Sequence, residues 1–236
     1  MKKLFLMLFL LGCSQEQLNN VLVQAQQMAT VGSGPLTEGQ MAAGLKEALL
    51  NGLNKSVSAL SVRDGFLKNN LLKIPFPEEA KIIKTTLGAI GLSSLVDKTE
   101  VSLNRAAEDA ASAAKPIFMA AITKLTFSDV LKIVQGSGTE ATQYLKKATS
   151  SQLTQAFSPK IATSLKKVDA TKYWSDLMGQ YNRVPLVKKV NPDLNSYVTQ
   201  LAIKGLFSKI ADEEVNIRKN PKARTSELLK RVFASK

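Results

Sequence analysis

The chain has 236 residues, of which 44% are hydrophobic and 22% charged, a composition typical of a globular protein with a buried core. It contains no histidine and one cysteine, which excludes Ser-His-Asp and Cys-His catalysis, the common zinc sites and internal disulfides. The net charge is +13. The sequence also lacks a Gly-x-Ser-x-Gly elbow, a phosphate-binding glycine loop and a Gly-x-Gly-x-x-Gly fingerprint. It therefore predicts no metal site and no cofactor.

The first thirteen residues have the form of a bacterial export signal. Lys2 and Lys3 precede an apolar run over residues 4–11, which is the secretory pattern. The Leu-Leu-Gly sequence before Cys13 resembles the lipobox, in which the cysteine becomes the acylated first residue. A membrane-spanning helix is the alternative, but the run is far shorter than the roughly 20 residues that a bilayer requires. The sequence predicts a signal peptide over 1–12 and lipidation at Cys13.

The segment after the cysteine predicts a tether and a location. Residues 13–36 are rich in Gln and Asn and end in a Gly-Ser-Gly-Pro linker, so we expect an acylated N-terminus and a tether. Ser14, rather than Asp, favours the outer membrane and a periplasm-facing lipoprotein if the host follows the enterobacterial sorting rule. The remainder, 37–236, is expected to form a single all-α domain.

The first predicted helix follows the tether. Thr37 and Gln40 form a capping box. Apolar residues then recur at steps of three and four and predict one buried face: Met41, Leu45, Leu49, Leu53, Val57 and Leu60. Pro75 and Pro77 interrupt the pattern, and Pro77 suits the first turn of a second helix that ends at Gly91.

Further helices fill the rest of the chain. The spacing predicts a long helix over 95–125, kinked at Pro116, with an alanine-rich apolar face. Shorter helices are predicted over 126–136 and from Thr139, Ser158-Pro159 and Asp169; a long helix runs from Asn191-Pro192 to about Lys219, and a last one follows Asn220-Pro221. No segment alternates with the period of a strand. We expect an all-α bundle of nine to eleven helices.

One acidic residue interrupts an apolar helix face near the C-terminus. Glu214 falls on a line with Val198, Ala202, Leu206, Ile210 and Ile217. A carboxylate that faces a core is costly unless it is paired, and Arg218 lies four residues further on, in the favourable acid-before-base order. We favour a structural ion pair over a functional carboxylate with a raised pKa.

A second polar cluster lies in the alanine-rich helix. One turn separates Asn104 from Glu108 and Arg105 from Asp109, so the spacing predicts these two pairs. Glu108 lies toward the edge of the small-residue stripe, which favours a solvated or interfacial pair. Convergence of Glu108 with Glu214 would create a paired-carboxylate candidate for general acid and base catalysis.

Several short segments carry a resemblance to a known family. They are Gly44 to Leu49, Asp64-Gly65-Phe66, Ile74 to Pro77, Asn104 to Glu108, Ala141 to Tyr144, Gly205-Leu206-Phe207, Glu213 to Arg218, and Asn220-Pro221-x-x-Arg224-Thr225. In their order and spacing the chain resembles the bacterial envelope family known as domain of unknown function 4197, from about Gln40 to Phe233. The resemblance implies an exported, often lipidated, mainly helical protein with no established activity, cofactor or catalytic residue.

The excess positive charge bears on possible partners. Basic residues are frequent in the C-terminal third, namely Lys209, Arg218, Lys219, Lys222, Arg224, Lys230 and Arg231. For an exported lipoprotein we expect anionic lipid, lipopolysaccharide or another envelope protein as the partner, beside the membrane held through the N-terminal lipid. Nucleic acid is disfavoured, because aromatic residues are only 6% and are not interleaved with the basic ones. A basic surface without a specific ligand is the alternative.

The functional prediction is a lipid-anchored envelope protein with a non-catalytic binding or scaffolding domain. The candidate polar cluster consists of Asn104, Arg105, Glu108, Glu214, Arg218 and Arg224. Two alternatives stay open. One is a carboxylate-dependent hydrolase or lyase, and the other is a carrier of an apolar or lipid ligand.

Overall fold

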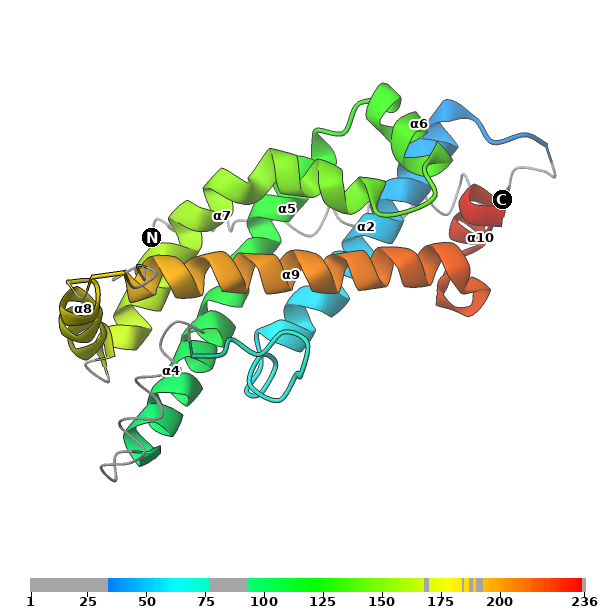
Figure 1. The fold of residues 1–236 in the computed structure, drawn as a ribbon. Helices are drawn as coiled ribbons and strands as arrows, with labels where there is room; N and C mark the ends of the chain where they lie inside the picture. The colour runs from blue at the N-terminus through cyan, green and yellow to red at the C-terminus, as the bar shows by residue number, and fades with distance from the viewer. Residues whose placement is uncertain are drawn as a thin grey trace, which may run out of the picture.

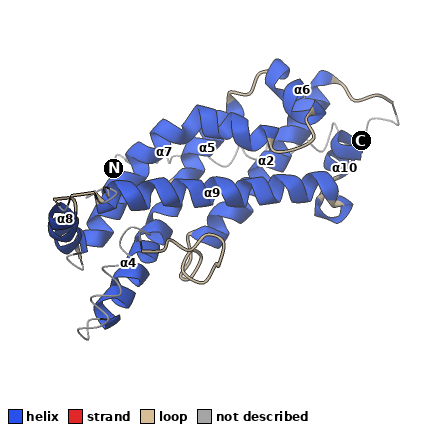
Figure 2. Ribbon diagram, viewed as in Figure 1, coloured by secondary structure: helices blue, strands red, loops and turns tan. Residues whose placement is uncertain are grey.

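The structure is a computed structural model that describes residues 34–76, 93–167, 170–183, 185–186, 189 and 193–234. The signal peptide, Cys13, most of the tether, the helix predicted from Pro77 to Gly91, and Asp169 lie outside the described residues. Within those ranges every regular element is a helix (Figure 2). The predicted all-α class is confirmed.

The α-helices in the described ranges are 8 to 27 residues long. In order they are α2 (Glu38–Leu60), α4 (Ser93–Ala111), α5 (Ala114–Thr123), α6 (Phe127–Gln135), α7 (Glu140–Lys166), α8 (Ala170–Tyr181), α9 (Leu194–Lys219), the 3-10 helix η2 (Pro221–Ala223) and α10 (Glu227–Ala234). The described part of the chain thus holds fewer α-helices than the nine to eleven predicted.

The break predicted at Ser158-Pro159 is wrong. Helix α7 runs through Pro159 without interruption. Proline removes one backbone hydrogen bond, but fully buried side chains on both sides of it, Phe157 and Ile161, keep the two halves packed into one core. Tertiary burial therefore overrides the local breaking signal.

The kink predicted at Pro116 is a complete break instead. Helix α4 ends at Ala111, and α5 begins at Ala114, which places Pro116 in the first turn of α5. The missing N–H has no intrahelical partner to lose in a first turn, whereas within a continuous helix the proline ring would clash with the carbonyl of Ser112. The chain consequently starts a new helix.

The capping box predicted at Thr37 is confirmed, and a second capping box opens α6. At the start of α2 the Gln40 backbone N–H donates to Thr37 Oγ1 at 3.2 Å, and the Thr37 N–H donates to Gln40 Oε1 at 3.1 Å. At the start of α6 the same exchange joins Thr126 and Asp129. These side chains satisfy backbone donors that a helix start leaves unpaired.

The long helices form two crossing layers (Figure 1). Helices α7 and α9 lie in front, and α2 and the α4–α5 pair run obliquely behind them; α7 packs against α4, α5 and α9, and α2 against α5 and α9. The layers bury a continuous core in which Phe118 and Phe207 meet edge to face at 5.7 Å. Helix α10 packs against α2 at the end of the molecule where α2 begins.

None of the helices in the described ranges is both long and apolar enough for a membrane crossing.

Candidate functional site

The loop after α2, residues 61–76, is held by polar side chains of α4. Glu108 is 4% exposed. Its Oε1 accepts hydrogen bonds from the backbone N–H groups of Phe66 at 3.0 Å and Leu67 at 3.1 Å. Its Oε2 accepts from Arg105 Nη1 at 2.6 Å. A buried carboxylate thus binds two N–H donors of the loop that no regular structure satisfies.

Asn104 binds the same loop at a second place. Its side chain is fully buried. The amide oxygen accepts from the Ile74 N–H at 2.8 Å, and the amide nitrogen donates to the Ile74 carbonyl at 2.9 Å and to the Glu100 carbonyl at 2.8 Å. One asparagine side chain therefore pairs both backbone groups of a loop residue, as a neighbouring strand would do.

Arg105 joins α4 to the tight turn of the loop. Its Nη2 lies 2.6 Å from Asp64 Oδ1, and Lys68 Nζ lies 2.8 Å from Asp64 Oδ2. The hydrogen bonds from Lys68 and Arg105 lower the pKa of Asp64, and the bonds to Asp64 and Glu108 raise the pKa of Arg105.

The backbone of the turn is tightly constrained. Asp64 has a left-handed backbone (φ 72°), and a Cβ on Gly65 would lie only 2.4 Å from the Ala59 carbonyl oxygen. The turn requires glycine at that position.

The pairing predicted within α4 is wrong in two respects. Arg105 pairs with Glu108 and not with Asp109, whose carboxylate accepts from the Ser164 hydroxyl at 2.8 Å. Asn104 binds Ile74 and not Glu108. Of the two predicted settings for Glu108, solvated or interfacial, the structure shows the interfacial one, since Glu108 is buried against the loop. The reason is tertiary: the 61–76 loop covers this side of α4 and supplies the partners.

The second carboxylate binds the start of α7. Glu214 is 9% exposed. Its Oε1 accepts from the Ala141 N–H at 3.1 Å, and its Oε2 accepts from the N–H and the hydroxyl of Thr142, both at 2.8 Å. The N-cap residue Thr139 makes no side-chain capping bond. Glu214 therefore caps α7 from another helix, where its negative charge also complements the helix dipole.

Arg218 of α9 binds the C-terminal end of α6, the helix that comes before α7 in the chain. Its Nη1 donates to the Gly136 carbonyl at 2.9 Å, and its Nη2 donates to the Ile133 carbonyl at 2.8 Å and to Glu214 Oε1 at 2.7 Å. The guanidinium carbon lies 5.7 Å from the centroid of the Phe233 ring, a cation–π distance. A cation at the carbonyl end of α6 is electrostatically favourable.

Arg224 closes the C-terminal end of α9. Its Nε donates to the Ile217 carbonyl at 3.1 Å, and its Nη2 donates to the Arg218 carbonyl at 2.8 Å. Arg224 thus binds the last turn of the helix that carries Glu214 and Arg218.

The structure divides the candidate residues into two groups. Asn104, Arg105 and Glu108 surround the 61–76 loop, and Glu214, Arg218 and Arg224 connect α6, α7 and the end of α9. Among the described residues, no hydrogen bond or ion pair joins Glu108 to Glu214, and no three acids or cysteines gather as metal ligands would. The arrangement holds backbone ends and loops in place.

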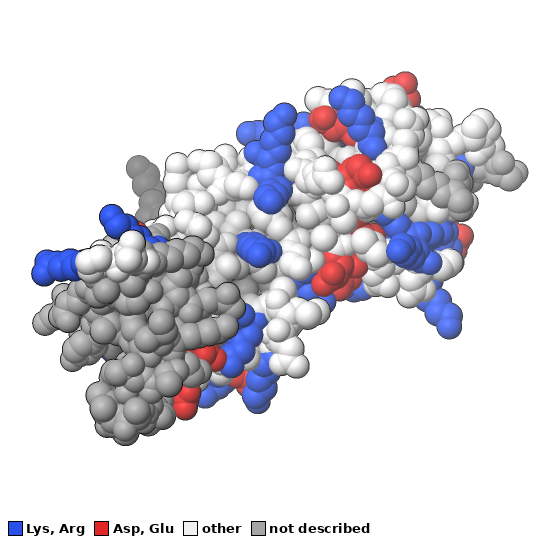
Figure 3. All heavy atoms as spheres, in the orientation of Figure 1, with Lys and Arg blue, Asp and Glu red and all other residues white. Residues whose placement is uncertain are grey.

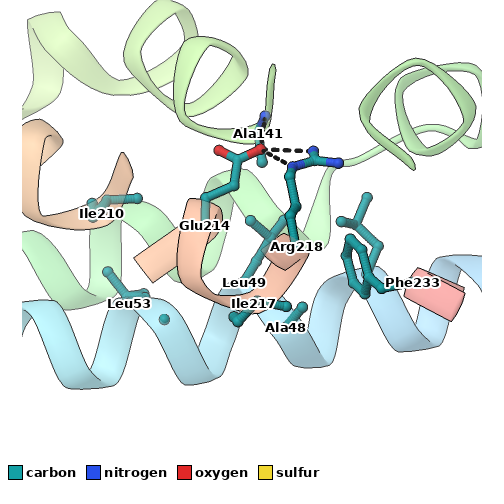
Figure 4. A pocket seen from close by; sticks show the side chains of 11 residues that line it. Ala48, Leu49, Leu53, Ala141, Ile210, Glu214, Ile217, Arg218 and Phe233 are labelled. Carbon is teal, nitrogen blue, oxygen red and sulfur yellow. Dashed lines mark hydrogen bonds and ion pairs between the residues drawn. The ribbon is translucent and has the colours of Figure 1, made fainter. Parts of the chain in front are cut away.

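A small cavity adjoins the second group (Figure 4). It lies between α2 and α9 and has a volume of about 20 Å³. Glu214 and Arg218 border it together with the apolar side chains of Leu49, Leu53 and Ile217. That space fits a single water molecule.

A comparison with known families decides the affiliation. A family model described as a protein of unknown function (DUF4197) matches residues 35–234. The chain belongs to the DUF4197 family. No significant match was found among curated proteins or among solved structures.

The segments that carry the DUF4197 resemblance meet in the two groups. Asp64-Gly65-Phe66, Ile74 and Asn104 to Glu108 form the contacts around the loop, and Gly205 contacts Phe66 from α9. Ala141 and Thr142 meet Glu214, and Arg224 binds the end of the same helix. Helical spacing did not identify Asp64 and Thr142 as candidate site residues. The only signal for them in the sequence was their position within the short segments that resemble the family.

Proposed function

We propose that this DUF4197 protein is a lipid-anchored protein of the bacterial envelope whose helical domain binds or scaffolds a partner without catalysis. The main observation in support is the use of the two buried carboxylates. Each oxygen of Glu108 and Glu214 accepts hydrogen bonds from backbone N–H groups, a hydroxyl or an arginine. Acids bonded in this way serve to hold the chain in shape, and they are poorly placed to exchange protons with a substrate.

The place where the tether joins the helices supports membrane attachment through Cys13. Arg231 of α10 donates to the Gly34 carbonyl at 2.9 Å, so the beginning of the described chain lies against the last helix. Exposed lysines at the same end are Lys219 and Lys222, whereas Lys230 is exposed but pairs with Glu227. A lipid on Cys13 would hold these side chains within reach of head groups.

Anionic lipid or lipopolysaccharide is the partner that this end of the molecule suits best. Each Lys or Arg close to an anionic membrane contributes about 1 kcal/mol. Arg218 and Arg224 are excluded from that contribution because their guanidinium groups bind carbonyls within the protein. The exposed lysines give a modest attraction that reinforces the lipid.

The two alternatives have less support. A hydrolase or lyase would use Glu108 and Glu214 together, whereas they bind different parts of the chain. A carrier of an apolar ligand would use the cavity between α2 and α9, whose volume of about 20 Å³ is too small for an acyl chain.

Fractionation of the native host tests the proposal. Wild-type protein is expected in the outer-membrane fraction and to need detergent for release, whereas Cys13→Ala is expected to remain as the uncleaved precursor. A Cys13→Ala protein that matures and distributes like the wild type would contradict lipid anchoring.

A further inference from the structure

A groove lies between α7 and α9, on the face that Figure 3 shows. Its volume is about 640 Å³, which is within the range of ligand sites. Two helices that pack tightly in the core form its walls, so its shape is fixed without a loop. None of the residues that line it is acidic.

Positive charge faces the groove from both walls. Lys146 of α7 and Lys204 of α9 line it, and both are exposed. Within the described ranges neither ammonium group has a hydrogen bond or an ion pair, unlike those of Lys68 and Lys73, which pair with acids. Figure 3 shows basic side chains over the middle of α7 and α9. The charge in the groove is therefore available to an anion.

Neutral polar groups complete the walls. Thr139, Gln143 and Ser208 line the groove, and their side chains make no hydrogen bond to another described residue. Hydroxyl and amide groups both donate and accept, which matches the hydroxyls of a sugar. Apolar side chains also line the groove: Leu201 and Ile203 are half-buried, whereas Phe207 is almost fully buried. The two half-buried side chains suit the C–H face of a sugar ring.

We infer that the groove between α7 and α9 binds an anionic glycan, with Lys146 and Lys204 on its acidic groups and Gln143 and Ser208 on its hydroxyls. A glycan fits better than an acidic peptide, because the neutral side chains of Thr139, Gln143 and Ser208 offer donors and acceptors to hydroxyl groups beside the two lysines. The inference rests on the proposed function in treating the helical domain as a binding module, and it names the class of ligand.

The test is calorimetric titration of the full chain, in mild detergent, with an oligogalacturonate. A neutral maltooligosaccharide of equal length and an oligoglutamate peptide are the comparison ligands. Lys146→Gln/Lys204→Gln is expected to raise the Kd at least about tenfold, because two charge-assisted hydrogen bonds are lost. Ser208→Trp, which fills the groove without changing the charge, is expected to weaken binding similarly.

The matched control is Lys147→Gln/Lys160→Gln, which removes the same charge from exposed positions of α7 outside the groove. It is expected to change the Kd less than about threefold, as screened surface charges do. Equal losses in both double variants, equal affinity for oligoglutamate, or no binding of oligogalacturonate would each overturn the inference. Acylation of Cys13 is measured separately, so a failed titration leaves the lipid anchor untouched.

Discussion

Glu214 and Arg218, one turn apart on α9, bind the facing ends of two consecutive helices. Glu214 accepts from the first N–H groups of α7, and Arg218 donates to the last carbonyls of α6. The two side chains are 2.7 Å apart. The acid thus lies at the N-terminal end of α7, where the helix dipole is positive, and the base lies at the C-terminal end of α6, where the dipole is negative. The pair therefore fixes the turn between α6 and α7 on α9.

Replacement of Arg218 by Ala is expected to lower the free energy of unfolding by about 3 to 5 kcal/mol, because Glu214 would keep a buried charge without its partner. The measurement is urea unfolding followed by circular dichroism. Lys219→Ala is the control; its side chain is exposed and adjacent, and it should change stability by less than about 0.5 kcal/mol. An unchanged unfolding midpoint for Arg218→Ala would place the pair outside the stabilising core.

Replacement of Asn104 by Ala tests the attachment of the 61–76 loop. The change leaves the buried N–H and carbonyl of Ile74 unpaired, so we expect a loss of about 2 to 5 kcal/mol. Ser102→Ala removes only a hydroxyl bonded to its own helix and should be nearly neutral. Equal stability of the two variants would show that the amide of Asn104 does not hold the loop.

Gly205 and Gly52 offer a matched comparison of helical glycines. A Cβ on Gly205 would lie 2.8 Å from Cε1 of the fully buried Phe66 ring, whereas one on Gly52 would meet Glu213 Cβ at an ordinary 3.5 Å. Gly205→Ala should cost about 1 to 3 kcal/mol through overpacking. Gly52→Ala should raise stability by about 0.5 to 1 kcal/mol because alanine favours the helix. A stabilised Gly205→Ala protein would contradict the close contact of α9 with the loop.

The pKa of Asp64 predicts a defined response to acid. Hydrogen bonds from Lys68 and then Arg105 hold it below its ordinary 3.8 in the folded protein. The resulting stability is present above pH 3.8 and is lost as the pH falls through the folded pKa, where the unfolded chain binds more protons. Asp64→Asn, which tolerates the left-handed backbone, should flatten this part of the pH profile. Parallel profiles for the two proteins would contradict the pairing.

Local patterns predict most helix starts but only part of the polar group around Glu214. The spacing of Glu214 and Arg218 predicts their contact, and a capping box predicts the start of α2. The carbonyls of α6 and the N–H groups of α7 that complete the group are about 70 to 85 residues away in the chain, so no helical period reveals them.

The predictions from sequence are wrong where a segment distant in the chain supplies the contact that determines the structure. Glu108 lies at the edge of its helix stripe, yet it is buried because a loop about 40 residues earlier folds over it. Pro159 has a local helix-breaking signal, yet its helix continues because Phe157 and Ile161 are buried on either side. In both cases tertiary packing outweighs the local preference.

Lipid anchoring at Cys13 can be measured from the intact mass of the protein purified from membranes of its native host. The predicted mass is that of a chain beginning at Cys13 and carrying several acyl chains, because stable anchoring requires more than one. A chain that still carries residues 1–12, or one that begins at Cys13 without lipid, would rule out lipid anchoring at Cys13.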